Sequence, residues 1–262
     1  MLRPRIIPCL LVKNKGLVKT VKFDNPKYVG DPINAVRIYN EKEVDELVVL
    51  DIDATAEGRE PDYTLIEHLA AECRMPLCYG GGVKTVAQIK KIIGLGVEKV
   101  AISSAAIQTP TLISEAAAQV GNQSVVVIID VKKKGFFSHY EIFTHNGKRA
   151  AGKHPVEFAG KVEELGAGEI VINSIDRDGM MKGYDLDLIS QIRKSVSIPL
   201  TALGGAGSVN DIYELVDNFG IIGAAAGSLF VFKGKYRAVL INYIGQVEKN
   251  ELIFKSVKSN IV

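Results

Sequence analysis

The sequence predicts an α/β fold, a (β/α)8 barrel built from two similar half-barrels. Short β-branched runs alternate with amphipathic helical segments along the whole chain. These runs are continuously apolar, which is typical of parallel strands buried on both faces. A glycine-rich pattern also occurs once in each half of the sequence. The 262 residues suit one barrel, because such barrels typically take about 250 residues.

Eight strands and the helices between them are expected in strict alternation. In chain order the predicted strands are Ile6–Val12, Glu46–Asp51, Leu77–Gly80, Lys99–Ile102, Ser124–Val131, Glu169–Asn173, Pro199–Ala202 and Gly223–Ala226. Helix starts are indicated at Asp31-Pro32, Thr85 (before Val86–Leu95), Thr111, Pro155, Asp187 and Ser208. An open doubly wound sheet is the alternative, but the Gly-x-Gly-x-x-Gly fingerprint is missing after the first strand.

Two segments depart from the regular alternation. Lys13–Gly30 is expected to be a long loop after the first strand, and Phe136–Gly147 alternates like a hairpin after the fifth. Loops that follow barrel strands lie on the catalytic face, where they can act as lids. The barrel is predicted over residues 1–248, and residues 249–262 are predicted to be a C-terminal tail.

Composition excludes several classes of protein. The chain is 47% hydrophobic and 24% charged with a net charge of +2, which gives no reason to expect binding to nucleic acid or a membrane. No apolar run approaches the roughly 20 residues of a membrane span, and the N-terminus lacks a signal-peptide pattern. A cytoplasmic protein is therefore expected. Cys9, Cys73 and Cys78 lack metal-ligand spacing, so we expect reduced thiols and neither a metal nor a cofactor.

The duplicated glycine pattern predicts two phosphate sites. Pro76–Gly82 leads through a helix to Val100–Ala105, and Pro199–Gly207 leads in the same way to Gly223–Ser228. Glycines at a strand end let backbone N–H groups approach an anion, and a following helix N-terminus adds its dipole. One such run is also compatible with a plain turn, but two in matching context favour a ligand with two phosphate groups. The residues assigned to these sites are Gly81, Gly82, Ser103, Ser104, Gly204, Gly205, Gly227 and Ser228.

Several aspartates end apolar runs at the predicted catalytic face. Asp130 follows the run Val125–Ile129, and partial desolvation should raise its pKa into the range useful for proton transfer. A structural carboxylate is the alternative there. Asp51 is compatible with catalysis or with anchoring a loop, since Asp53 follows closely. Asp178, followed by Gly179, is compatible with a contact to substrate hydroxyls or with a plain turn.

These residues resemble those of the cyclase subunit of imidazole glycerol phosphate synthase, HisF. The shared runs span the chain in order: Arg5–Leu10, Gly30–Pro32, Leu50–Ile52, Gly80–Gly82, Val127–Asp130, Tyr140–His145, Gly166–Glu169, Asp176–Gly179, Gly183–Asp185 and Gly204–Gly207. The resemblance implies that a HisH-like glutaminase docks at the N-terminal face of the barrel and supplies ammonia. It implies that the barrel adds this ammonia to PRFAR, a phosphorylated ribulose-type substrate, giving imidazole glycerol phosphate and AICAR in histidine biosynthesis.

The resemblance also implies an ammonia gate at the bottom of the barrel. Its residues would be Arg5, Glu46, Lys99 and Glu169, which begin strands at matching places. Four such charges need mutual pairing, so a purely structural ring is the alternative. Lys19, in the first loop, is assigned to the substrate site.

The chain departs from the family pattern at the catalytic face. The family uses two aspartates for acid/base chemistry; the second matches Asp130, but Leu11 stands at the position of the first. Losing one general acid/base typically costs about 10²–10⁴-fold in rate. Met180 and Leu203 stand where the family usually has Thr and Ser.

These departures predict a diverged paralogue, similar to those encoded with surface-polysaccharide pathways. Such a protein would pass ammonia from a glutaminase to a separate sugar-amidating enzyme. A full histidine-pathway synthase, with Asp130, Asp51 or a water replacing the missing aspartate, is the main alternative. A single-subunit phosphosugar isomerase is a third class, against which the charged gate argues.

Overall fold

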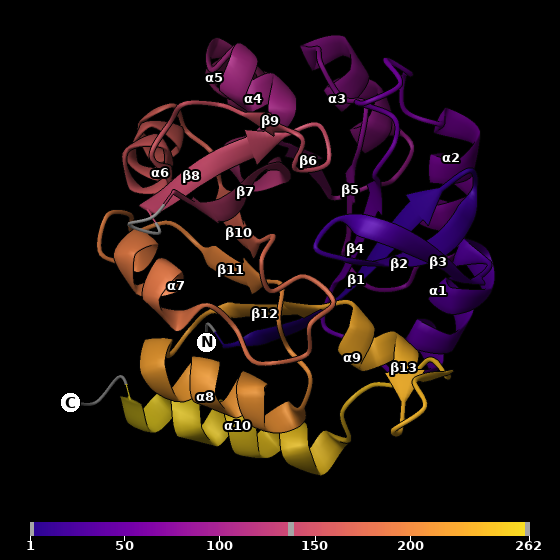
Figure 1. Ribbon diagram of the computed structural model, residues 1–262. Coiled ribbons are helices and arrows are strands. Elements are labelled where there is room, and N and C mark those ends of the chain that lie inside the picture. Colours follow the sequence, from indigo (N-terminus) through magenta and orange to yellow (C-terminus); the bar gives the residue numbers. More distant parts are fainter. Residues whose placement is uncertain (1–2, 136–138, 260–262) are drawn as a thin grey trace.

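Eight parallel strands close into a barrel in the computed structural model (Figure 1), which describes residues 3–135 and 139–259, apart from the side chains of 254–259. Each strand pairs with the next along the chain, and the last pairs back with the first through Arg5 and Gly223. The predicted (β/α)8 barrel is thereby confirmed. The barrel strands are β1 (Arg5–Lys13), β4 (Leu47–Asp51), β5 (Leu77–Gly80), β6 (Lys99–Ile102), β7 (Val125–Lys134), β10 (Glu169–Ser174), β11 (Leu200–Leu203) and β12 (Gly223–Ala226).

The strand bounds differ from the predicted ones where neighbours decide them. β7 runs to Lys134 instead of Val131, because its last residues pair antiparallel with the strand that follows. β11 starts at Leu200 and not at Pro199, since proline has no N–H to donate to a ladder.

Helices follow the strands and cover the outside of the barrel (Figure 1). They are α1 (Pro32–Glu41), α2 (Tyr63–Glu72), α3 (Val86–Gly94), α5 (Thr111–Val120), α6 (Pro155–Glu164), α7 (Leu186–Arg193), α8 (Val209–Phe219) and α10 (Gln246–Ser259). The predicted helix start at Asp187 is wrong, because Asp185 is the N-cap and accepts a hydrogen bond from the Leu188 N–H. Tyr140 Oη donates to the same Asp185 carboxylate at 2.8 Å, which fixes this cap in place.

The predicted loop Lys13–Gly30 is instead a β-hairpin of β2 (Gly16–Val21) and β3 (Asp24–Gly30). β2 pairs antiparallel with the end of β1, with Leu11 opposite Val18. The turn between β2 and β3 places Lys22 and Phe23 in the left-handed region, at φ 55° and 64°. Turn sequences usually signal such positions with Gly or Asn, so this hairpin carried no local signal.

The matching segment of the second half also forms paired strands. β8 (His139–Thr144) pairs antiparallel with the extension of β7, and the short β9 (Arg149–Ala150) pairs with β8. Residues 136–138 of the predicted hairpin lie outside the described residues. Each half-barrel thus carries a hairpin after its first strand, on the face where the barrel strands end.

The C-terminal segment contributes to the barrel wall. The predicted tail starts at residue 249, which lies inside α10, the helix packed along α8 (Figure 1). Leu252 is buried, and Lys249 Nζ lies 2.9 Å from the Asp45 carboxylate. α10 therefore takes the place of the eighth helix of the barrel. No helix in the described part of the chain is both long and apolar enough to cross a membrane.

The barrel has two apolar regions. The larger one fills the space between the strands and the surrounding helices. The smaller one, which we call the lumen, fills the barrel axis and consists of Ile7, Cys9, Val48, Cys78, Ala101, Val126, Ile128, Val171 and Ala225. Small and medium-sized apolar side chains thus separate the two ends of the barrel.

Candidate active site and barrel floor

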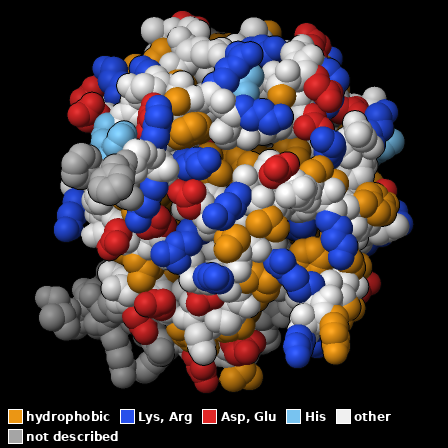
Figure 2. Space-filling model, viewed as in Figure 1, with side chains coloured by type: hydrophobic (Ala, Val, Ile, Leu, Met, Phe, Trp, Pro, Cys, Tyr) orange, Lys and Arg blue, Asp and Glu red, His pale blue; other side chains and the backbone are white. Residues whose placement is uncertain are grey.

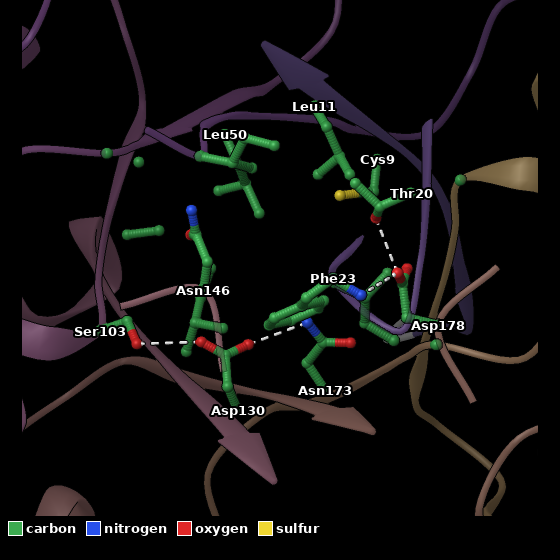
Figure 3. Close-up of a pocket in the computed structure, with 18 of the residues that line it drawn as sticks. Cys9, Leu11, Thr20, Phe23, Leu50, Ser103, Asp130, Asn146, Asn173 and Asp178 are labelled. Carbon is green, nitrogen blue, oxygen red and sulfur yellow. Dashed lines mark hydrogen bonds between the residues drawn. The ribbon is translucent and has the colours of Figure 1, made fainter. Parts of the chain in front are cut away.

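A pocket lies where the barrel strands end (Figure 3). All the residues assigned from the sequence to the catalytic and phosphate sites border it: Leu11, Lys19, Asp51, Gly81, Gly82, Ser103, Ser104, Asp130, Asp178, Gly179, Gly204, Gly205, Gly227 and Ser228. The structure therefore brings these residues together, while their individual roles remain predictions.

One side of the pocket is polar. Ser103 follows β6, Asp130 lies within β7 and Asn173 lies within β10; these strands are neighbours, and we call the three residues the polar arc. Asn173 Nδ2 donates to Asp130 Oδ1 at 2.9 Å, and Ser103 Oγ donates to Asp130 Oδ2 at 3.3 Å (Figure 3). Burial raises the pKa of Asp130 to about 6, although both hydrogen bonds oppose the rise. This carboxyl can exchange a proton near neutral pH, as a general acid/base must.

The opposite side of the pocket is apolar. Leu203, Leu11 and Leu50 come from β11, β1 and β4, and they pack on the lumen. Figure 3 shows Leu11 and Leu50 across the pocket from Asp130. We call these three residues the leucine arc. Because leucine has no titratable group, the leucine arc itself can neither give nor take a proton.

Lys19 reaches into the pocket from the β2–β3 hairpin. Its Nζ donates to the Cys9 carbonyl at 2.6 Å, and a Cβ placed on Gly227 would lie 2.7 Å from it. Burial lowers the pKa of Lys19, and the negative charge of Asp178 acts against this effect. The amine therefore lies against the glycine loop that ends β12, where a phosphate would need a partner.

Asp178 fastens this hairpin to the barrel. Its Oδ2 accepts from Thr20 Oγ1 at 2.7 Å and from the Phe23 N–H at 3.1 Å (Figure 3). Burial raises the pKa of Asp178, while Thr20, Phe23 and Lys19 lower it. Of the two predicted interpretations, contact with substrate or a turn, the hydrogen bonds support a role in holding the turn and the hairpin together.

The glycine loops approach other parts of the backbone closely. Gly81 has φ +122° and Gly205 has φ +114°, and a Cβ on either would collide with the carbonyl oxygen of Asp51 or Gly183, respectively. Glycine is therefore required at both positions. Ser104 and Ser228 begin the short helices α4 (Ser104–Gln108) and α9 (Ser228–Val231) beside the two loops.

Asp51 anchors its own loop. Its Oδ1 accepts from the N–H groups of Asp53 and Ala54 at 3.2 and 3.1 Å, and Arg59 Nη1 lies 3.3 Å from Oδ2. Of the two interpretations left open by the sequence, these contacts support anchoring. In the described residues, no group of three or more His, Cys, Asp or Glu side chains is placed to hold a metal ion.

Sequence reasoning missed several pocket residues, including Asn173, Phe23 and Asn146. Asn173 did carry a signal, because it follows the apolar run Ile170–Ile172 as Asp130 follows the run Val125–Ile129. Asn146 lies in the turn after β8 with φ 56°, and a Cβ on the neighbouring Gly147 would lie 3.4 Å from the Phe23 ring. The tips of the two hairpins therefore meet beside the pocket. Figure 2 shows Lys and Arg side chains gathered around the middle of this face, as an anionic ligand would require.

The floor of the barrel is closed by a ring of four charges. Arg5 donates hydrogen bonds to Glu46 and Glu169, the latter at 2.8 Å. Lys99 Nζ lies 2.8 Å from Glu46 and 2.9 Å from Glu169. Burial opposes the charged forms, yet the opposite charges prevail, so the pKa of Arg5 and Lys99 is raised and that of Glu169 is lowered. The structure thus assembles the four predicted gate residues into one ring, below the lumen.

Comparisons with known proteins agree with this architecture. A family model described as "Histidine biosynthesis protein" matches residues 5–237. The "Putative imidazole glycerol phosphate synthase subunit hisF3" of Vibrio vulnificus (strain YJ016) is 58% identical over 253 residues, which are 97% of each chain. A similarly named HisF protein of Leptospira interrogans is 56% identical over 254 residues, 97% of this chain and 100% of its own. The "Imidazole glycerol phosphate synthase subunit HisF" of Lactococcus lactis subsp. lactis (strain IL1403) is 39% identical over 262 residues, 100% of this chain and 98% of its own.

Proposed function

The chain belongs to the histidine biosynthesis protein family, as a HisF-like barrel, and on this premise we propose that it receives ammonia from a partner glutaminase and delivers it to a phosphorylated or sugar acceptor. The glutaminase, a HisH-like subunit, would dock at the N-terminal face, below the ring of Arg5, Glu46, Lys99 and Glu169. We further propose that the protein is a diverged paralogue in sugar amidation, because Leu11 replaces a proton-transfer group.

The observation that carries the proposal is the arrangement along the barrel axis. A closed ring of charges lies at one end, an apolar lumen follows, and the pocket opens at the other end. A passage opened between these packed apolar side chains would disfavour ammonium strongly, because a charge is costly to move out of water, but uncharged ammonia would be far less affected. A charged ring that rearranges when the partner binds would admit ammonia to this passage.

The pocket supports both the phosphorylated acceptor and the delivery of ammonia to it. The two glycine loops and Lys19 favour a phosphorylated ligand, since amines and the backbone N–H groups of glycine loops are phosphate partners. The leucine arc places apolar groups where ammonia would leave the lumen. Ammonia would therefore reach the pocket beside side chains that neither protonate it nor activate an acceptor.

A second candidate is a working cyclase subunit of imidazole glycerol phosphate synthase, which converts PRFAR to imidazole glycerol phosphate and AICAR. One observation favours it: Asp130 lies in the pocket with two hydrogen-bond donors, and burial raises its pKa to about 6. A single carboxyl poised near neutral pH can serve as acid and base in successive steps.

A cyclase assay with ammonium chloride and PRFAR separates these two candidates. Free ammonia removes the need for the glutaminase, so the assay isolates the chemistry of the barrel. The unmodified chain is compared with Leu11→Asp and with Leu50→Asp, a matched control that places a carboxyl on the neighbouring strand of the leucine arc.

We expect no turnover by the unmodified chain, turnover by Leu11→Asp, and none by Leu50→Asp. Turnover by the unmodified chain would refute the conduit proposal in favour of the cyclase. Turnover by neither the chain nor Leu11→Asp would argue for a nitrogen acceptor other than PRFAR, and amidation of a phosphorylated or nucleotide-linked sugar would then be assayed.

A further inference from the structure

Asn173 lies between Asp130 and the glycine loop that follows β11, which are far apart in the sequence. It lies beside Asp130 in the β7–β10 ladder and beside Leu203 in the β10–β11 ladder. Its amide nitrogen donates to Asp130 Oδ1 at 2.9 Å. Its Oδ1 faces the glycine loop after β11, since a Cβ placed on Gly204 would lie 3.1 Å from it.

Among the described residues, none forms a hydrogen bond with the amide oxygen of Asn173, although this residue is only 5% exposed. A buried acceptor without a donor costs free energy, and native proteins rarely leave one unsatisfied. The orientation of the amide is fixed, because a charged carboxylate at Asp130 accepts only from Nδ2. The free oxygen is therefore directed away from Asp130 and toward the Gly204 loop, which borders the pocket.

We propose that Asn173 is a positioning residue with two roles: it orients the Asp130 carboxylate, and its free Oδ1 binds an N–H or O–H donor carried by the ligand next to a phosphate. The donor would lie between the Gly204 loop and Asp130. This inference rests on the proposed function only in taking the pocket as the site of a phosphorylated ligand.

The arrangement couples ligand binding to the proton on Asp130. When Asp130 is charged, Asn173 presents an acceptor to the ligand. When Asp130 is protonated, its O–H can donate to the amide oxygen, and a rotated amide then presents a donor. A ligand donor therefore favours the charged carboxylate. Other charged or titratable groups border the same pocket, namely Asp51, Asp178, Lys19, Cys9 and His145, so each experiment below compares variants at fixed conditions.

The first experiment needs no ligand. Carbon-13 NMR follows the Asp130 carboxyl through a pH titration of the full chain, with Asp130→Asn used to assign the signal. We expect Asn173→Leu to raise the midpoint by about 1 pH unit, the tenfold change in proton affinity that loss of one hydrogen bond to a charged group brings. Ser103→Ala should raise it less, because its hydrogen bond is longer, at 3.3 Å.

Two controls keep this experiment decisive. Asn146→Leu removes another pocket amide and should leave the midpoint unchanged. Asn173→Asp retains the size and polarity of asparagine, so it tests the same position if Asn173→Leu does not fold. Its added charge should raise the midpoint of the Asp130 titration further. An unchanged midpoint in both Asn173 variants would overturn the positioning role.

The second experiment tests the ligand contact with two small probes. Glycerol 3-phosphate and n-propyl phosphate share a phosphate on three carbons, but only the former has hydroxyl donors. By calorimetry we expect the unmodified chain to bind glycerol 3-phosphate about 5–10-fold more tightly, as one added hydrogen bond allows. Asn173→Leu should bind both compounds equally.

Equal binding of the two probes by the unmodified chain would overturn the ligand contact. Binding of neither probe would refute the phosphate site of the proposed function and the ligand contact with it. The carboxyl titration would still decide the positioning role, so the two failures are distinguishable.

Discussion

Removing Lys99 from the floor of the barrel should lower the free energy of unfolding by more than the loss of an exposed ion pair would. Lys99 Nζ contacts both Glu46 and Glu169 within 2.9 Å. Each carboxylate residue is only 4% exposed. In Lys99→Met, which keeps a long unbranched side chain, the two carboxylates share Arg5 as their only remaining ring cation.

The structure sets the size of the effect. Removing one partner of a buried ion pair costs about 3–5 kcal/mol, because the other charge is left without compensation. Arg5 still pairs with both carboxylates, and the Lys99 side chain is 19% exposed, so water can reach the gap. We therefore expect a loss of about 2–3 kcal/mol, which is a large share of the roughly 5–15 kcal/mol that stabilises a typical domain.

Urea unfolding at pH 7 of the unmodified chain, Lys99→Met, Glu46→Gln and the double variant measures this energy. The double variant should lose at least about 1 kcal/mol less than the sum of the single losses, because it removes one charge of each sign. The ring holds the pKa of Glu169 low. The stability that charged Glu169 contributes to the folded protein is therefore complete above the ordinary pKa of Glu. It disappears as the pH falls through the lower pKa that Glu169 has in the folded protein.

The difference between Lys99→Met and the unmodified chain should accordingly be greatest near pH 7 and shrink in acid. A loss below about 0.5 kcal/mol at pH 7, as is usual for an exposed pair, would refute this account of the floor. So would strictly additive losses in the double variant.

Three further predictions concern other parts of the barrel. Asp130→Asn should stabilise the protein by about 1–2 kcal/mol at pH 8, because burial raises the pKa of Asp130 to about 6 and makes its charged form costly. The gain should vanish below about pH 4, and urea unfolding at both pH values measures it. Gly179→Ala should displace the β2–β3 hairpin, since its Cβ would collide with the Thr20 carbonyl, and hydrogen exchange in that hairpin should accelerate at least about tenfold. Leu252→Ala should cost about 2–4 kcal/mol in urea unfolding, whereas a dispensable tail would show almost no loss.

Much of the barrel could be predicted from the sequence because its signals are local. The continuous apolar run before Asp130 indicated a buried parallel strand, and the glycines at positions 81 and 205 indicated close backbone approach. Both features depend on residues within a few positions. The order of strands around the barrel then brought the predicted pocket residues together.

The parts that escaped prediction depend on distant partners. The β2–β3 hairpin turns through Lys22 and Phe23 in left-handed conformations, which the hydrogen bonds to Asp178 support from far along the chain. The role of Asn173 became visible only through the carboxylate of the neighbouring strand. Similarly, the polar sequence around Lys249 gave no sign of the Asp45 carboxylate that binds it.

The meeting of the two hairpins has a kinetic consequence. Phe23 at one tip lies against Gly147 at the other, beside the mouth of the pocket. Separation of these tips would widen the mouth for a ligand the size of a bisphosphate. Where that opening is the slow step, the dwell time of the ligand depends on the opening rate of the hairpins as well as on the strength of its own contacts. Loosening one tip should shorten occupancy and leave the equilibrium affinity of the phosphate groups nearly unaltered.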